Sequence, residues 1–330
     1  MTDDAYREAG VDIDLEATAI RALIGNLTYK RTGNYRMTGE TGHYAGLIDF
    51  GERVLALTVD GVGTKMLVAD HLRDWTTVGI DCIAMNVNDL YVMNIEPVAF
   101  VDYVATDHLD VEKMAQIGTG LNEGARQSNI DIVGGETATL KGLVNGLDLA
   151  GTCFGIQEKQ RVVNGGTIRP GDVIVGVPSS GIHSNGLTLA RKVAEEYGGY
   201  DQKLGNGKTL GEELLTPTRI YHESLRINTL ADIHGMCHIT GGGLLNFTRL
   251  SGYGFEITRP LPRQKIFDWI QECAGIADEV MYRTFNMGMG FAYVTGPDEA
   301  RRVVKELPGS QVVGEITPRS GAWLGDVRIT

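Results

Sequence analysis

A short apolar run that ends in a charged glycine turn constrains the fold of this chain more than any other feature. Residues 54–59, Val-Leu-Ala-Leu-Thr-Val, are typical of a buried strand, and Asp-Gly-Val-Gly-Thr-Lys follows directly. The glycines permit positive φ and a close approach of backbone N–H groups to an anion. The aspartate can hold a hard cation, and the threonine and lysine can hold phosphate oxygens. The alternative is that these residues form an ordinary turn. The segment is not a Walker loop, because the Gly-x-x-x-x-Gly-Lys-Ser/Thr spacing is absent. The residues expected to contact a metal–nucleotide here are Asp60, Gly61, Gly63, Thr64 and Lys65.

A second set of polar groups lies in a segment with helical periodicity. Within residues 77–90, apolar side chains recur at positions 80, 83, 84, 87 and 90, which predicts a helix. Asp81, Met85 and Asn88 share one face of that helix, and Asp89 lies at its margin. Two carboxylates and an amide on an otherwise apolar helix suit a Mg²⁺ site that substrate phosphates complete. The alternative is that Asp81 caps the helix and that backbone groups satisfy a buried Asn88.

A third set resembles the first. Residues 130–133, Ile-Asp-Ile-Val, predict a short strand that ends in glycines and delivers an acid and a hydroxyl. Three element ends that each supply an acid beside glycine or threonine are what a metal–nucleotide site requires. The residues of this third set are Gly134, Gly135, Glu136 and Thr137.

Charge and composition exclude several classes of protein. The net charge of −12 argues against a nucleic-acid partner and against an anionic membrane surface. The acidic start has no apolar core of a secretory signal, and no apolar run approaches the length of a membrane span. The four cysteines are widely spaced and predict reduced thiols rather than zinc ligands or disulfides. A cytoplasmic protein is expected.

The 330 residues are long for one core and predict two domains, 1–165 and 166–330, joined through a Gly/Pro-rich stretch. Two helices alternate with about four strands in the first half, which predicts an α+β domain with helices on one face of the sheet. The second half predicts an α/β or α+β domain. Residues 32–46 are too polar for a strand and predict a mobile loop or lid.

Two further glycine turns, residues 178–186 and 240–243, lie in the second half. Each is predicted to join a strand to a helix N-terminus, which is a good anion site, although glycine there could also serve close packing. His183 is predicted to be exposed and to contact ligand, whereas His238 lies in an apolar strand and is predicted to be structural. The residues expected to contact substrate are Ser179, Ser180, Gly181, Ser184, Asn185, Thr240, Gly241, Gly242 and Gly243.

In their order and spacing these motifs resemble the phosphoribosylformylglycinamidine cyclo-ligase family, the aminoimidazole ribonucleotide synthetases of purine biosynthesis. The opening residues 6–14 also resemble the N-terminal signature of that family, so that the resemblance spans essentially the whole chain. It implies a two-domain cyclo-ligase fold with a larger C-terminal α/β domain. It also implies a homodimer in which the N-terminal sheet pairs with its copy to close a barrel.

The resemblance further implies ATP and Mg²⁺ as cofactors and a phosphoribosyl substrate. The expected reaction is ring closure of formylglycinamidine ribonucleotide through an iminophosphate, with release of ADP and phosphate. The alternatives are another enzyme of the same superfamily, such as a formylglycinamidine ribonucleotide synthetase, or a nucleotide-binding scaffold without turnover. Residue by residue, the resemblance implies metal or phosphate-site acids at Asp60, Asp81, Asp89 and Glu136, phosphate contacts at Thr64, Lys65 and Thr137, and catalytic roles for Lys65 and His183.

Overall fold

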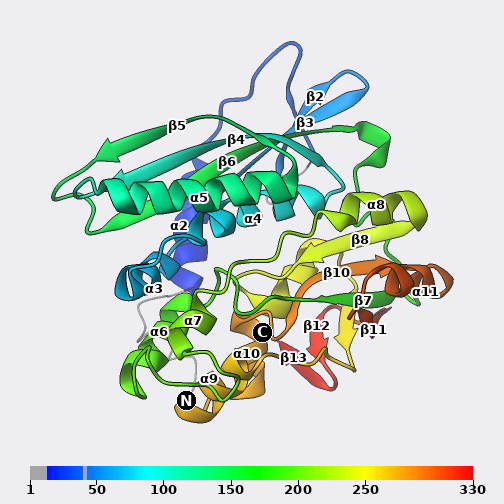
Figure 1. Ribbon diagram of the computed structural model, residues 1–330. Coiled ribbons are helices and arrows are strands. Elements are labelled where there is room, and N and C mark those ends of the chain that lie inside the picture. The colour runs from blue at the N-terminus through cyan, green and yellow to red at the C-terminus, as the bar shows by residue number, and fades with distance from the viewer. Residues whose placement is uncertain (1–12, 40–42, 330) are drawn as a thin grey trace.

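Each half of the chain is built on one sheet (Figure 1). The computed structural model describes residues 13–39 and 43–329, so residues 6–12 of the expected N-terminal signature lie outside the described residues. One sheet contains strands from residues 37–158 and the other contains strands from residues 173–329. The segment between them includes the Gly/Pro-rich stretch at which the sequence predicts a domain boundary.

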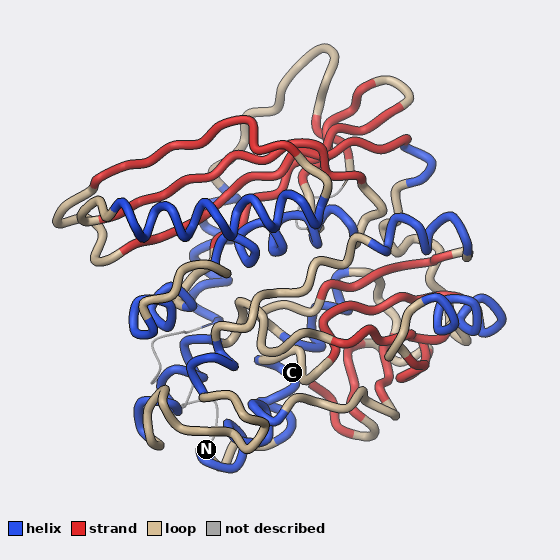
Figure 2. The backbone as a smooth tube through the Cα atoms, viewed as in Figure 1, coloured by secondary structure: helices blue, strands red, loops and turns tan. Residues whose placement is uncertain are grey.

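The strands of the N-terminal sheet are the red segments at the top of Figure 2. Their order in the sheet is β1-β2-β3-β6-β4-β5. Neighbouring strands are antiparallel except β4 and β5, which run parallel because α5 crosses between them. The strands are β1 (Met37–Thr38), β2 (Gly46–Phe50), β3 (Arg53–Gly61), β4 (Glu96–Thr106), β5 (Asp131–Thr139) and β6 (Leu147–Glu158).

Two helices, α4 (Val78–Tyr91) and α5 (Val111–Ser128), lie side by side on one face of this sheet (Figure 1). Their close approach depends on glycine. A Cβ atom at Gly79 would lie 2.1 Å from the Leu121 nitrogen, and one at Gly120 would lie 2.6 Å from the Thr76 oxygen. The prediction of helices on one face is confirmed. On the other face, called the open face below, side chains such as Leu57 and Val59 are exposed among the described residues.

The C-terminal sheet has the strand order β13-β12-β9-β11-β7-β10-β8 and is antiparallel except between β12 and β9. Its strands are β7 (Val173–Pro178), β8 (Ile233–His238), β9 (Gly254–Ile257), β10 (Met289–Thr295), β11 (Gln311–Thr317), β12 (Gly321–Leu324) and β13 (Val327–Ile329). The α-helices of this half are α6 (Leu187–Glu196), α7 (Leu210–Leu214), α8 (Glu223–Leu230), α9 (Lys265–Ala274), α10 (Asp278–Thr284) and α11 (Pro297–Glu306). The other helices among the described residues are α2 (Ile13–Gly25), α3 (Lys65–Leu72) and the 3-10 helices η1 (Lys159–Arg161) and η2 (Gly243–Arg249).

Two sequence-based expectations about local structure are wrong. The third motif does not follow a strand but lies within β5, which runs on to Thr139 because its backbone pairs with β4. Residues 32–46 are not one polar loop. Met37 and Thr38 form a short strand with β2, and Tyr44 and Ala45 are buried, whereas residues 40–42 lie outside the described part.

The cysteines are free thiols, and Cys82, Cys153 and Cys237 are buried, as predicted. Within residues 13–39 and 43–329, no helix has the combination of length and apolar character needed to cross a bilayer.

Candidate active site

Two aspartates and a histidine meet where β3, α4 and β8 come together. Asp60 lies near the end of β3, and burial together with the charge of Asp89 raises the pKa of Asp60 to about 6. Asp89 lies in the last turn of α4, and its Oδ1 is 2.8 Å from Nδ1 of His238 on β8. The His238 ring is fully buried, and its Nε2 has no hydrogen-bond partner among the described residues. The structure thus brings two predicted metal ligands together and adds His238, which the sequence assigned a structural role.

Glu136 lies on the other face of the sheet from this group. It pairs with Tyr103 on β4, whereas the neighbouring Asp102 pairs with Gly135. Paired residues point to the same face and successive residues alternate, so Glu136 and Tyr103 point to the open face. The described residues hold no group of three or more His, Cys, Asp or Glu side chains arranged to bind a metal ion.

Lys65 and Asp81 form a buried ion pair, with 2.8 Å between Lys65 Nζ and Asp81 Oδ1 and no exposed surface on either side chain. Lys65 Nζ also donates to the Thr216 carbonyl over 2.6 Å. Ser184, a predicted substrate contact, donates from its hydroxyl to the same Asp81 oxygen over 3.0 Å. Three residues expected at ligand sites are therefore bonded to one another between the two halves.

Asn88 is buried and hydrogen-bonded to backbone groups, which was the alternative to a role in a Mg²⁺ site. Its Nδ2 donates to the Arg219 carbonyl and its Oδ1 accepts from the Tyr221 amide, each over 2.9 Å. Both ends of the amide are thus bonded to the backbone of the segment between α7 and α8. Thr64 makes a hydroxyl contact of 3.3 Å with Thr188 at the start of α6.

The expectation that His183 is exposed is wrong. Its side chain is fully buried, with φ of +64°, and its Nε2 accepts from the Ser180 amide over 3.2 Å. Burial, and then the nearby charges of His238, Lys65 and Arg219, hold the pKa of His183 well below its usual value, so the ring is neutral at pH 7. Its Nδ1 has no partner within the described part of the chain.

The two C-terminal glycine turns differ from the expected strand-to-helix junctions. Six residues separate Ser180 from the first residue of α6, and Ser180 Oγ donates to the Pro217 carbonyl over 2.6 Å. The turn at residues 240–243 leads into the 3-10 helix η2 instead of an α-helix. Thr240 bonds to Asn246, and Gly242 and Gly243 have φ of +101° and +51°. Here the glycines serve the turn itself.

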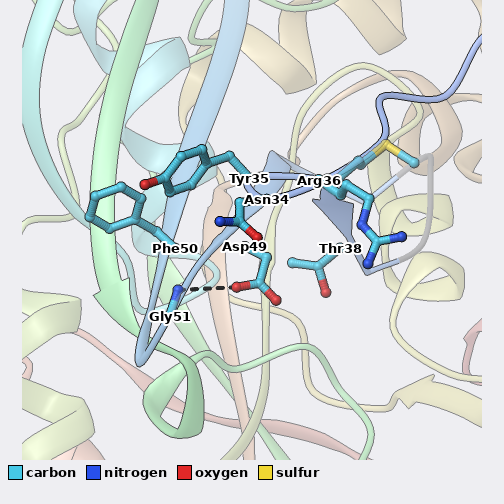
Figure 3. A pocket seen from close by; sticks show the side chains of 9 residues that line it. Asn34, Tyr35, Arg36, Thr38, Asp49, Phe50 and Gly51 are labelled. Atoms are coloured by element: carbon cyan, nitrogen blue, oxygen red, sulfur yellow. Dashed lines mark hydrogen bonds between the residues drawn. The ribbon is translucent and has the colours of Figure 1, made fainter.

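A separate hollow lies beside the β2–β3 hairpin (Figure 3). Tyr35 and Phe50 stack there with ring centroids 5.2 Å apart, next to Arg36 and Asp49. It shares no residue with the predicted site.

Sequence reasoning missed three residues at or near the site: His238, Asp102 and Thr218. Asp102 shares the inner sheet face with Asp60, and its carboxylate lies against Gly135. Asp102 lies two residues after Phe100 in an apolar strand, so both side chains point to the same face, and this spacing could have identified Asp102 from the sequence. His238 and Thr218 had no such local signal, because their partners lie 149 and 137 residues away.

The raised pKa of Asp60 predicts a pH-dependent stability difference in metal-free protein. Folding favours the protonated carboxyl, so ionised Asp60 destabilises the folded state increasingly as the pH rises from about 4 through 6, by on the order of 2 to 3 kcal/mol. The Asp60→Asn variant lacks this penalty. Urea unfolding in EDTA should show the variant gaining stability relative to wild type between pH 5 and 7.5. A pH-independent difference would contradict the assignment.

Family models match both halves of the chain. Residues 42–157 match "AIR synthase related protein, N-terminal domain", and residues 169–324 match "AIR synthase related protein, C-terminal domain". A phosphoribosylformylglycinamidine cyclo-ligase from Methanosarcina barkeri is 50% identical over 98% of both chains. The chain belongs to the phosphoribosylformylglycinamidine cyclo-ligase family. Another member, from Pyrococcus horikoshii, is 49% identical over 92% of this chain and 91% of its own.

Solved structures with similar folds are more distant in sequence. A thiamine monophosphate kinase from Aquifex aeolicus has a TM-score of 0.66 at 16% identity, covering 97% of this chain and 99% of its own. PurL of T. maritima, solved with FGAR, has a TM-score of 0.59 at 17% identity, covering 86% of this chain and 45% of its own. These likenesses support the two-domain cyclo-ligase fold.

Proposed function

We propose that this chain catalyses the ATP-dependent ring closure of formylglycinamidine ribonucleotide to aminoimidazole ribonucleotide, releasing ADP and phosphate. The observation that carries the proposal is the 50% identity to a named cyclo-ligase across both halves of the chain. Structures of this fold solved with ATP or with AMPPCP and TMP are consistent with ATP as the second substrate. The product is a small molecule, and we place the enzyme in the cytoplasm because its buried cysteines are free thiols.

The chemistry requires activation of a formyl oxygen, which is a poor leaving group. Transfer of the γ-phosphoryl group to that oxygen forms an iminophosphate, and attack by the amidine nitrogen then closes the ring and expels phosphate. The protein has mainly to place the two substrates and neutralise charge. We propose that Asp60, Thr64 and Asp89 face the phosphates, and that the 240–243 turn holds the ribose phosphate through its backbone N–H groups.

The pair Asp60 and Asp89 fits a divalent cation. Burial, and then the charge of Asp89, raises the pKa of Asp60, and a cation between the two carboxylates would relieve their repulsion. Bound Mg²⁺ would neutralise charge on the transferred phosphoryl group and orient it. Glu136 is on the open face of the sheet, away from this pair.

Phosphate release tests this function directly. Purified protein with ATP, Mg²⁺ and formylglycinamidine ribonucleotide should release phosphate and form aminoimidazole ribonucleotide in equal amounts. Omission of the ribonucleotide should abolish the release. Phosphate release only with formylglycinamide ribonucleotide and an ammonia source, with formylglycinamidine ribonucleotide as the product, would support the synthetase alternative. Nucleotide binding without turnover would support a scaffold.

The open face of the N-terminal sheet supports a homodimer. Leu57, Val59, Val101 and Tyr103 share this face, and between 38% and 75% of each residue is exposed. Such a row of apolar side chains is unusual on a monomer surface and is the expected barrel interface between two copies. The apolar side chains Leu15, Ile20, Leu23 and Ile24 of α2 are exposed as well.

A charge on this face should disrupt the dimer. Val59 is 75% exposed, so Val59→Asp leaves the folded monomer unstrained but buries an unpaired carboxylate in the interface. Light scattering after gel filtration should give the monomer mass for Val59→Asp. Val111, 86% exposed at the start of α5, is the matched control, and Val111→Asp should stay dimeric. A dimeric Val59→Asp variant would place the interface elsewhere.

A further inference from the structure

Asp81 lies at the junction of the two halves, where four donors converge on one carboxylate oxygen. Oδ1 accepts from Lys65 Nζ over 2.8 Å and from the Thr218 amide over 2.7 Å. It also accepts from the hydroxyls of Thr218 and Ser184 over 2.6 and 3.0 Å. Lys65 belongs to α3, whereas the other donors belong to the C-terminal half. One carboxylate therefore joins both halves.

The second oxygen of Asp81 is a poor metal ligand. Oδ2 is buried and has no hydrogen-bond partner among the residues described, and the side chain has no exposed surface. Mg²⁺ keeps several waters and phosphate oxygens in its shell, so its protein ligands must reach an open cleft. The Asp89 side chain, which is 20% exposed, meets this requirement, and Asp81 does not.

Residues 215–221 lie in the connection from α7 to α8 (Figure 1). Other side chains on α4 and at its N-cap continue the contact with this segment. The Thr77 hydroxyl donates to the Leu215 carbonyl over 3.2 Å, and Asn88 bonds to the backbone at positions 219 and 221. Positions 77, 81 and 88 recur at helical spacing on one face. Asp81 is thus the charged centre of a longer junction between α4 and this segment.

The partner that most depends on Asp81 is Lys65. Its ammonium has no exposed surface and has the Thr216 carbonyl as its other acceptor. Burial lowers the pKa of Lys65, and the Asp81 carboxylate opposes that shift. Without the carboxylate, the ammonium would be a buried charge with no counter-charge. Lys65 directly follows the glycine turn after Asp60, so the ion pair fixes that turn against α4, and the bond to the Thr216 carbonyl ties it to the C-terminal half.

We propose that Asp81 is a positioning residue and not a metal ligand. It holds Lys65 in place and ties α4 to residues 215–221 and to Ser184. The inference corrects the metal role expected from the sequence. It rests on the proposed function only where turnover is measured.

The test compares Asp81→Asn with Asp89→Asn. Hydrogen exchange measured by mass spectrometry should accelerate at least about tenfold at the Thr218 amide in Asp81→Asn and stay unchanged in Asp89→Asn. The Mg²⁺ affinity of Asp81→Asn, measured by calorimetric titration in the presence of a non-hydrolysable ATP analogue, should stay within about twofold of wild type. The Mg²⁺ affinity of Asp89→Asn should be at least about tenfold weaker than that of wild type. Tenfold weaker Mg²⁺ binding in Asp81→Asn, with unchanged exchange at residues 215–221, would overturn the proposal.

Turnover separates positioning from simple stabilisation. At saturating Mg²⁺ and substrates, kcat of folded Asp81→Asn should fall at least about tenfold, because Lys65 no longer anchors the glycine turn that follows Asp60. An unchanged kcat would overturn the positioning role. Absence of turnover in wild type would instead refute the proposed function, and the exchange and calorimetry results would still decide whether Asp81 binds metal.

Two more conservative variants test the positioning role of Asp81 if Asp81→Asn does not fold. Thr218→Val removes one donor to Asp81 and keeps the β-branched shape, whereas Thr218→Ser keeps the hydroxyl. Exchange at residues 215–221 should accelerate in Thr218→Val and be restored in Thr218→Ser, with Mg²⁺ affinity unchanged in both. Equal exchange in wild type and Thr218→Val would overturn the proposal.

Discussion

Asp89→Asn is expected to lower kcat/KM by at least about a hundredfold while the protein stays folded. An asparagine has the shape of aspartate, and its Oδ1 can still accept from the His238 ring, which lies 2.8 Å from Asp89. It lacks the negative charge that attracts Mg²⁺ and that, with Asp60, would define the cation position. Phosphate release at limiting Mg²⁺ and the thermal midpoint should be measured together.

The matched control is Asp49→Asn. Asp49 is an exposed carboxylate beside the β2–β3 turn that pairs with Lys159 over 2.9 Å and is not one of the predicted site residues. Its replacement should leave turnover within about twofold of wild type, since exposed ion pairs contribute little. Wild-type turnover of Asp89→Asn at limiting Mg²⁺ would exclude Asp89 from the metal site.

Gly243→Ala is expected to destabilise the protein by at least about 4 kcal/mol or to prevent folding. A Cβ atom at this position would lie 2.0 Å from the Tyr282 carbonyl oxygen, which is part of α10 and cannot move alone. The φ of +51° adds strain for any L side chain. Urea unfolding, or soluble yield where the variant does not fold, measures the effect.

Gly241 supplies the comparison within the same turn. It lacks a positive φ, and the nearest atom to an added Cβ is Asn185 Oδ1 at 3.3 Å, the end of a side chain that can adjust. Gly241→Ala should therefore cost less than about 1 kcal/mol. Gly242 would be a poor choice for testing anion binding, because its φ of +101° strains any replacement. A similar loss of unfolding free energy in Gly241→Ala and Gly243→Ala would mean that close packing is not the reason why glycine is needed at position 243.

Periodicity and local motifs are sufficient to predict much of the fold. The helix predicted within residues 77–90 is α4, and α5 is the second of the two helices predicted to alternate with strands in the first half. Asp60 also lies at the end of the strand expected before it, and Asp89 lies in the expected helix. These successes have one physical reason: burial of one face of a helix or strand imposes a repeat on the residues of that element itself.

The tertiary structure alone decided which polar groups meet. Pairing with β4 extended β5 through the third motif and put Glu136 on the open face, which no local pattern encodes. The buried positions of His183, His238 and Asp81 depend on partners more than a hundred residues away or on the packing of β10 and α4. A sequence motif specifies the chemistry of a side chain, but charge, pKa and access depend on the surroundings that distant segments supply. For this protein, the sequence therefore determined the family and the positions of the acids, hydroxyls and histidines, and the packing of the two halves decided which of these groups are buried and which are exposed.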